Sequence, residues 1–337
     1  MRKALLTGSA GFIGFHLARL LLAHGYKLHG YDGMTDYYDV RLKQARNEIL
    51  LASPGYSFTQ GMLEDAVSLD AVADAFAPDV ILHLAAQAGV RYSLENPRAY
   101  VDGNVTGTFN VLEVARRHQV AHLLMASTSS IYGASSKLPF TETDKVDHPL
   151  TIYAATKKAT EAMGHSYAHL WNIPTTMFRF FTVYGSWGRP DLAYFKFTEA
   201  ILAGRPINVY NRGEMWRDFT AVGDLVEAVR LLIDVPPGRP APGTAIPEGD
   251  SLSPDAPFRI VNIGNSEKVK LTDFIDALED VLGTKAIRNL MPMQKGDVPA
   301  TWADATLLRR LTGYAPKTSV RDGMTDFAAW FRAYYKV

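Results

Sequence analysis

The sequence predicts an α/β protein with a doubly wound parallel sheet and a smaller C-terminal α/β region. Three observations favour this class. Short apolar segments of strand character alternate with segments of helical spacing through the first half of the chain. A glycine-rich turn, residues 8–14, joins the first strand to the first helix. Hydroxyl side chains at 127–130 follow the fifth strand, at the end where open α/β sheets bind ligands.

The composition excludes several classes of protein. The chain has 337 residues, 47% of them hydrophobic and 21% charged, which is ordinary for one large or two modest globular domains. Lysine plus arginine and aspartate plus glutamate each total 35, so no charge bias indicates a nucleic-acid partner. There is no cysteine, which excludes disulfides, thiolate metal ligands and cysteine nucleophiles.

A soluble cytoplasmic protein without a membrane partner is expected. The chain begins with strand-like residues at 4–6 and shows no signal-peptide pattern. Its apolar runs are all too short to span a bilayer.

The glycine turn is typical of the start of a dinucleotide-binding unit. Gly8 permits the tight turn, Gly11 lets the backbone approach a pyrophosphate, and Gly14 lets the helix pack on the strand. The free amides of Phe12 and Ile13 at the helix start are expected to meet the phosphates. The spacing is G-x-x-G-x-x-G, so the generic G-x-G-x-x-G fingerprint fits only approximately.

Apolar patterning predicts the elements of the first half. Strands are expected over residues 3–7, 27–31, 56–59, 80–84 and 122–126. Helices are expected over residues 15–23 and 105–118, before the third and fourth strands, and from residue 154 onward. Alternation at this rhythm indicates a parallel sheet.

The pattern changes in the second half. Strands are expected over residues 179–185, 207–210, 217–222 and 260–263, and helices over 195–202 and 320–335. Residues 236–257 are rich in Pro and Gly and are expected to form an exposed loop.

Asp32 is expected to contact the adenosine ribose. It lies at the end of the second strand, about where an acidic residue follows a glycine turn, which favours NAD over NADP. The alternative is that Asp32 only starts a turn with Gly33. Leu63, which follows the third strand, is expected to line the adenine.

The fourth strand is expected to end beside the nicotinamide. The residues concerned are Leu84, Ala85 and Ala86. His83, which precedes them, is expected to be a packed strand residue rather than a catalyst.

Tyr153 and Lys157 form a candidate acid/base pair. They are four residues apart and share one face of a helix. A tyrosine hydroxyl titrates near ~10, and a neighbouring ammonium favours the phenolate and lowers that pKa. The pair is therefore suited to moving a proton on or off a sugar or alcohol hydroxyl. Taken alone, the spacing is weak, because such pairs occur by chance on many helices.

No metal is expected. The histidine pairs His118/His122 and His165/His169 have helical spacing, but a third ligand and a glutamate base are missing. His122 also starts a strand, so solvated or capping histidines are expected.

Several motifs together carry a resemblance to a known family. They are Thr7-Gly-x-x-Gly-x-x-Gly14, His83-Leu-Ala-Ala86, Asn104, Ser127-Thr128-Ser129 and Tyr153-x-x-x-Lys157. The chain resembles the extended short-chain dehydrogenase/reductase family over almost its whole length. Within it, residues 32–39, 88–97 and 179–196 are similar to UDP-glucuronate 4-epimerases.

The resemblance implies a tightly held NAD and a UDP-sugar. Tyr153 would take the proton from the sugar 4-hydroxyl while hydride passes from C4 to NAD, and hydride would return to the other face of the 4-keto sugar. Lys157 would hold the nicotinamide ribose and lower the Tyr153 pKa. Thr128, with Ser129 beside it, would hydrogen-bond the 4-oxygen. The family's cofactor residues map here onto the glycine turn, Asp32, Leu63, the 84–86 segment and Asn104.

The resemblance also implies a substrate site and an organisation. The residues implied for the UDP-sugar are Arg91, Thr128, Tyr153, Thr182, Arg189, Val209, Tyr210, Arg217 and Asp297. A Rossmann domain would cover 1–180 plus about 218–265, and a sugar-binding domain 181–217 plus about 266–337. A homodimer is implied by analogy. Met62 departs from the family, which often has aspartate there, so one adenine hydrogen bond is expected to be missing.

Sister enzymes differ in chemistry at residues 128–130. Dehydratases carry an Asp-Glu pair after the threonine, and decarboxylases a glutamate two residues after it. This chain has Thr128-Ser129-Ser130, with no carboxylate to deprotonate C5 or assist loss of CO2. Plain epimerisation is therefore expected.

The identity of the sugar rests on Arg189. An arginine in this loop can bind a C6 carboxylate through two parallel hydrogen bonds, which a hydroxymethyl group cannot match. The alternative is that Arg189 only pairs with Asp191 at the surface. UDP-glucuronate is the expected substrate. The alternatives are UDP-glucose or UDP-N-acetylglucosamine 4-epimerisation, UDP-glucuronate decarboxylation and a non-catalytic NAD-binding protein.

Overall fold

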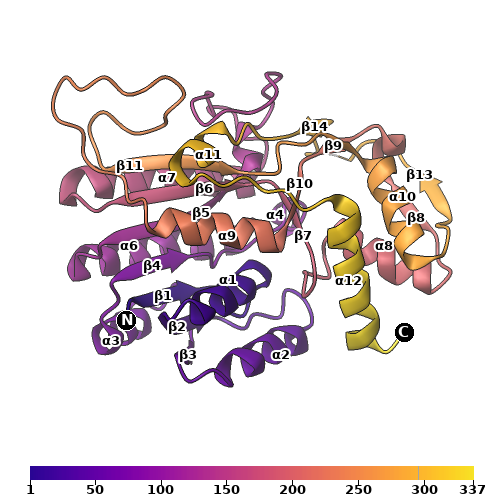
Figure 1. Ribbon diagram of the computed structural model, residues 1–337, viewed down its shortest axis with the longest axis horizontal. Coiled ribbons are helices and arrows are strands. Elements are labelled where there is room, and N and C mark those ends of the chain that lie inside the picture. The colour runs from indigo at the N-terminus through magenta and orange to yellow at the C-terminus, as the bar shows by residue number, and fades with distance from the viewer. Residues whose placement is uncertain (295) are drawn as a thin grey trace.

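A seven-stranded parallel sheet forms the centre of the computed structural model, which describes residues 1–294 and 296–337 (Figure 1). The strands are β1 (Lys3–Thr7), β2 (Lys27–Asp32), β3 (Tyr56–Gln60), β4 (Val80–His83), β5 (His122–Thr128), β6 (Thr175–Phe180) and β11 (Phe258–Ile263). They are ordered β11-β6-β5-β4-β1-β2-β3, and every pairing is parallel. The strand order reverses at β1, so the predicted doubly wound fold is confirmed.

Helices cover both faces of this sheet. One face carries α1 (Phe12–Ala23), α2 (Val40–Leu51) and α9 (Val222–Ile233). The other carries α3 (Ala66–Phe76), α6 (Gly107–His118) and α7 (Ile152–Trp171). Successive strand residues alternate between the two cores, as with Leu5 and Leu6, because side chains on a strand point to opposite faces.

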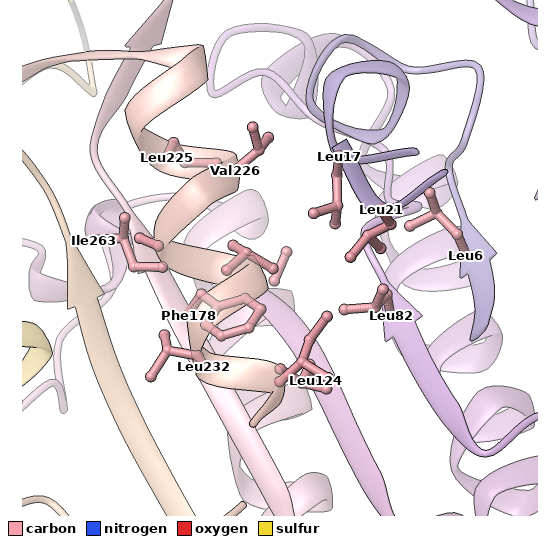
Figure 2. Packing of buried hydrophobic residues seen from close by; sticks show 14 of the residues in the cluster. Leu6, Leu17, Leu21, Leu82, Leu124, Phe178, Leu225, Val226, Leu232 and Ile263 are labelled. Carbon is pink, nitrogen blue, oxygen red and sulfur yellow. The ribbon is translucent and has the colours of Figure 1, made fainter. Parts of the chain in front are cut away.

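The core between α1, α9 and the sheet is apolar throughout. Figure 2 shows Leu17 and Leu21 of α1 and Leu225 of α9 beside strand residues such as Leu82 and Phe178. All five side chains are fully buried. Burial of apolar surface contributes about 25 cal/mol per Å², so this packing fixes α1, and with it the glycine turn, against the sheet.

A second group of elements forms its own core at one end of the sheet. It contains α8 (Ala193–Leu202), α10 (Leu271–Leu282), α12 (Val320–Tyr335), and the strands β8 (Ile207–Val209), β9 (Trp216–Arg217), β12 (Val269–Lys270), β13 (Arg288–Leu290) and β14 (Ala300–Thr301). The chain enters this core after β6 and returns to the sheet with α9 and β11. It leaves again at β12, returns with α11 (Thr306–Thr312) and ends in α12. The proposed division into two domains stays a prediction.

Shorter elements connect these cores. They are α4 (Tyr92–Glu95), α5 (Pro97–Tyr100), the π-helix η1 (Val101–Thr106), the 3₁₀ turns η2 (Ser129–Tyr132) and η3 (Tyr210–Gly213), and the parallel pair β7 (Thr182–Tyr184) and β10 (Phe219–Ala221). The helix expected over 105–118 therefore begins with a wider π turn. The helix expected over 320–335 is confirmed.

Two predicted strands are divided in the structure. The segment expected as 179–185 begins at Thr175, in β6, and is interrupted after Phe180. The segment expected as 217–222 is interrupted at Asp218, whose buried carboxylate accepts hydrogen bonds from the amides of Asn265, Ser266 and Ala303. These bonds join three distant segments, so local patterning could not reveal them.

Helix α9 follows directly and was not anticipated. Its buried residues include Leu225, Val226, Val229 and Leu232, which is the spacing of one helical face. This helical spacing is visible in the sequence, but the strand predicted over 217–222 overlapped the start of the helix and hid it.

The Pro- and Gly-rich segment 236–257 contains no helix or strand and is largely exposed, as expected. Its second half is attached to the edge strand β11, because Ser253 donates its amide to the Phe258 carbonyl at 2.9 Å and Ser251 Oγ accepts from the Ile260 amide at 3.1 Å. Among the described residues, none of the helices has the length and apolar character needed to cross a membrane.

Candidate active site

A cleft of about 800 Å³ lies at the carboxyl ends of the sheet strands. Its walls come from the glycine turn, the ends of β2, β4 and β5, the start of α7, and segments 180–192 and 296–301. The predicted residues that line it are Gly8, Gly11, Phe12, Ile13, Gly14, Asp32, Leu63, Leu84, Ala85, Ala86, Thr128, Ser129, Tyr153, Lys157, Thr182, Arg189, Arg217 and Asp297. Most of the residues selected from the sequence therefore share one cavity.

The glycine turn is shaped for close backbone approach. Gly8 has a positive φ of 75°, and a Cβ there would lie 2.7 Å from the Ala85 nitrogen. A Cβ on Gly14 would lie 2.0 Å from the Gly8 carbonyl oxygen. Helix α1 begins at Phe12, three residues earlier than expected, so its free N-terminal amides lie at the cleft. This arrangement fits a diphosphate.

Asp32 occupies the end of β2 and is held by two backbone amides. Its Oδ2 accepts from Ala10 at 3.1 Å, and its Oδ1 accepts from Met34 at 2.9 Å. The side chain is only 8% exposed yet lines the cleft. The sequence offered two interpretations of Asp32, a local turn and a carboxylate beside the glycine turn. The structure contains both features.

Tyr153 and Lys157 project from the first two turns of α7. Thr151 caps this helix, because its hydroxyl accepts from the Ala154 amide at 3.2 Å. Both side chains line the cleft, and the Lys157 side chain is buried. Burial raises the pKa of Tyr153, while the Thr128 hydroxyl and the Arg189 guanidinium act in the opposite direction. Burial lowers the pKa of Lys157 to about 8, opposed by the Glu161 carboxylate.

These shifts correct one expectation. The Tyr153 pKa was expected to lie below its ordinary value because of Lys157, but in this structure burial dominates and moves it upward. The Arg189 guanidinium is a neighbouring charge that opposes this rise in the Tyr153 pKa.

The hydroxyl cluster at the end of β5 is ordered by a tight turn. Thr128 Oγ1 accepts from the Ser130 amide at 3.2 Å and donates to the Ser130 hydroxyl at 3.3 Å. Thr128, Ser129 and Ser130 all line the cleft. The three positions offer hydroxyl groups to a ligand and no carboxylate.

A buried polar network, which sequence reasoning missed, lies beneath this cluster. Arg179 donates to both Glu161 oxygens, at 3.0 and 2.9 Å, and Ser127 donates to Glu161 Oε1 at 2.7 Å. Arg179 also donates to the Tyr132 hydroxyl at 3.0 Å. Both ionic side chains are 2% exposed. Glu161 lies one turn beyond Lys157 on α7, a spacing that could have indicated it.

The far wall of the cleft includes residues from β7, β9 and the segment before β14. Thr182, Arg217 and Asp297 line it. Arg217 is fixed by the Trp216 and Val298 carbonyls, each accepting at 2.9 Å. Arg91 and Tyr210 are not among the residues that line the cleft. Arg91 lies 3.6 Å from an Asp297 oxygen and 5.0 Å from the centre of the Tyr210 ring.

Other predicted residues lie behind the cavity wall. Val209 is fully buried in the second core, so its side chain is not offered to the cleft. Asn104 is buried and accepts from the Gln87 amide at 2.8 Å, while Nδ2 donates to the Gln87 carbonyl at 3.2 Å. Asn104 therefore fixes the backbone of Gln87, which lines the cleft, without lining the cleft itself.

Arg189 pairs with Asp191, but not at the surface. Its Nε and Nη2 donate to the two Asp191 oxygens at 3.0 and 2.7 Å, and each side chain is 22% exposed. Tyr37 also donates to Asp191, at 3.2 Å. The alternative was that Arg189 only pairs with Asp191 at the surface. The ion pair is present, but Arg189 lines the cleft rather than the outer surface. Asp191 engages Nε and Nη2 of Arg189, and the Arg189 residue lines the cleft.

Two of the histidines considered in the sequence analysis are buried within the fold. His83 is buried between the hydroxyls of Thr7 and Thr108, at 2.8 and 3.0 Å, which confirms it as a packed strand residue. His122 was expected to be solvated or capping; it is instead buried, 2.9 Å from the Thr176 hydroxyl. No cluster of metal-ligating side chains occurs in the described chain.

The fold and this site define a class of protein. A doubly wound sheet with a glycine turn, and a Tyr-x-x-x-Lys helix facing the same cleft, are the parts of a dinucleotide-dependent enzyme that moves a proton at a hydroxyl. The chain belongs to the NAD dependent epimerase/dehydratase family, whose model matches residues 4–244.

Similar proteins extend over the whole chain. It is 54% identical to a probable UDP-glucuronate 4-epimerase of Rhizobium meliloti, covering 99% of this chain and 98% of that one. It is 42% identical to UDP-glucuronate 4-epimerase 1 of Arabidopsis thaliana, covering 99% and 77%. The crystal structure of UDP-glucuronic acid 4-epimerase from Bacillus cereus, in complex with UDP-glucuronic acid and NAD, superposes with a TM-score of 0.87. That structure is 29% identical, and coverage is 99% and 100%.

Proposed function

We propose that this protein is an NAD-dependent UDP-sugar 4-epimerase that interconverts UDP-glucuronate and UDP-galacturonate. The observation that carries the proposal is the joint placement of Tyr153, Lys157 and Thr128 in one cleft with the glycine turn. Full-length similarity to proteins named for this activity supports it.

The proposed roles follow from placement. Tyr153 takes the proton of the sugar 4-hydroxyl and later returns it, and Thr128 hydrogen-bonds the same oxygen. Lys157 and the Asn104-ordered Gln87 segment line the cofactor side of the cleft. NAD, when bound, would supply the acceptor for hydride from sugar C4 and the donor that returns it to the opposite face. The positive charge of a bound nicotinamide ring would favour the Tyr153 phenolate, against the effect of burial.

The absence of a carboxylate at 128–130 supports epimerisation over elimination or decarboxylation. A base there would be needed to deprotonate C5. The other proposed substrate contacts are Arg91, Thr182, Tyr210, Arg217 and Asp297, with Val209 acting only as packing behind Tyr210. Two domains and a homodimer are proposed by analogy with the family, and a cytoplasmic location is proposed as well.

The substrate assignment is tested by incubating the pure protein separately with UDP-glucuronate, UDP-glucose and UDP-xylose and separating the products. UDP-galacturonate is expected from the first sugar, with much slower turnover of the other two. Faster turnover of UDP-glucose would contradict the assignment.

NAD is expected to copurify. The cofactor must stay bound between two hydride transfers, and the glycine turn with Asp32 provides the diphosphate and ribose contacts. Denaturing the pure protein and assaying the supernatant for nucleotide measures this. Protein without nucleotide, and active only with added NADP, would contradict both the Asp32 role and the closed redox cycle.

Arg189→Ala is expected to lose about 1.5–3 kcal/mol of transition-state stabilisation with UDP-glucuronate, the range for hydrogen bonds to a charged group. The loss with UDP-glucose is expected to be much smaller, because a hydroxymethyl group gains little from a guanidinium. The measurement is kcat/KM for both sugars. Equal losses would show that Arg189 does not bind the C6 carboxylate.

Asp191 gives a control for the same site. Asp191→Asn keeps a hydrogen-bond acceptor but removes the charge that holds the Nε edge of Arg189. It should retain more of the preference for UDP-glucuronate than Arg189→Ala does.

A further inference from the structure

The segment 186–189, which carries Arg189, is held by a buried arginine from a distant helix. Arg46 lies on α2 and is 0% exposed. Its Nη2 donates to the carbonyls of Trp187 and Gly188, at 2.5 and 3.2 Å. Its Nη1 donates to the Ala10 carbonyl at 3.0 Å and to the Tyr38 hydroxyl at 2.8 Å. One guanidinium thus joins the glycine turn to the peptide groups just before Arg189.

Packing alone does not account for a charged residue at this position. No carboxylate lies within ion-pair distance of Arg46 in the described chain, and its Nε has no hydrogen-bond partner there. Burying a cation without a counter-ion is unfavourable, and an apolar side chain of similar length would fill the same space without that cost. Compared with an apolar side chain, the arginine contributes four hydrogen bonds of defined direction.

Two of the residues that Arg46 contacts, Ala10 and Trp187, are also held by other interactions. Both backbone polar groups of Ala10 are hydrogen-bonded. The amide donates to Asp32 at 3.1 Å, and the carbonyl accepts from Arg46. Trp187 has a φ of +58°, an unfavourable conformation for a residue other than glycine that persists only where its surroundings enforce it.

Those surroundings come from three helices. The Trp187 ring packs on Phe15 of α1 at 5.3 Å and on Trp330 and Tyr334 of α12 at 5.3 and 5.2 Å. Burial lowers the pKa of His16 to about 4, so its ring is neutral, and its Nε2 lies 2.8 Å from the Ser186 carbonyl oxygen. The contacts of Arg46 complete this support next to Arg189.

We propose that Arg46 is a positioning residue for Arg189, which fixes the carboxylate-binding guanidinium relative to the glycine turn that holds the cofactor. The inference rests on the proposed function, because it requires a charged sugar in the cleft. Arg46 touches neither ligand in this account. It acts through the Trp187 and Gly188 carbonyls.

A double-mutant cycle on NAD-loaded protein tests the proposal. Binding of UDP-glucuronate and UDP-glucose is measured by calorimetry for wild type, Arg46→Met, Arg189→Ala and the double variant. Arg46→Met should lower the ratio of the two affinities by roughly 10-fold or more, in the direction of Arg189→Ala. The double variant should be no worse than Arg189→Ala, since residues acting through one another are not additive.

Asn47→Ala is the matched control. Asn47 is the next residue on α2, is buried, and accepts from Tyr56 rather than contacting 186–189. It should lose stability but keep the wild-type affinity ratio. If Arg46→Met yields no folded holoprotein, Arg46→Lys serves in the same cycle, because a single ammonium cannot span both Ala10 and the 187–188 carbonyls.

The outcomes separate the two proposals. An unchanged ratio in the Arg46 variant, or a double variant that loses the product of the single effects, overturns the positioning role. Wild-type protein that fails to bind UDP-glucuronate overturns the proposed function and, with it, the role given to Arg46.

Discussion

Replacing Tyr153 by phenylalanine is expected to reduce turnover by roughly 10²–10⁴, the usual contribution of a positioned acid or base. The phenylalanine ring can keep the edge-on contact with Tyr100, whose ring centre lies 6.0 Å away. Folding and NAD content should therefore persist while proton transfer at the sugar 4-hydroxyl fails. The measurement is single-turnover and steady-state epimerisation of UDP-glucuronate, with NAD content assayed on the same preparation.

Tyr100→Phe is the matched control for this change. The Tyr100 hydroxyl donates to the Ala88 carbonyl at 3.0 Å and plays no part in the proposed chemistry. Its removal should cost far less turnover than removal of the Tyr153 hydroxyl. If Tyr153→Phe turned over at a near-normal rate, another group would have to carry the proton.

Glu161→Met is expected to destabilise the protein by about 3–5 kcal/mol, because it leaves the buried Arg179 guanidinium without its counter-ion. The same change removes the acceptor of the Ser127 hydroxyl, directly behind the catalytic cluster. The free energy of unfolding in urea, at a fixed NAD concentration, measures the loss. The double variant Glu161→Met, Arg179→Met should recover much of it, since no unpaired charge remains.

A surface ion pair provides the comparison. Glu199 and Arg205 are each 58% exposed, so Glu199→Met should cost less than about 1 kcal/mol. Equal losses at the two sites would mean that burial does not determine the contribution of the Glu161–Arg179 pair.

Features that depend on neighbours in sequence could be predicted from the sequence. Short apolar segments that alternate with helical segments, the glycine turn, and the four-residue spacing of Tyr153 and Lys157 are local signals. The parallel sheet and the common cleft follow from them. The family resemblance added the substrate side, where apolar patterning is weak.

Features that depend on long-range contacts could not be predicted. Arg46 meets its partners at 187 and 188, and Tyr37 meets Asp191, across separations of more than a hundred residues. The direction of the Tyr153 pKa was missed for a similar reason. The Tyr–Lys spacing was visible in the sequence, but the burial that outweighs it is a property of the assembled cleft.

The repeated passage of the chain between the two cores has a consequence for biosynthesis. Strand β11 completes the sheet only at Ile263, and the far cleft wall ends at Thr301, with α12 still to follow. A growing chain on the ribosome would therefore expose the apolar faces of α8 and β8 long before α10 and α12 exist to cover them. The wall of the ligand site that contains Asp297 cannot form until the chain has been synthesised as far as Thr301. Closure of the site around a sugar would therefore come later in biosynthesis than formation of the glycine turn and of the helix that carries Tyr153 and Lys157.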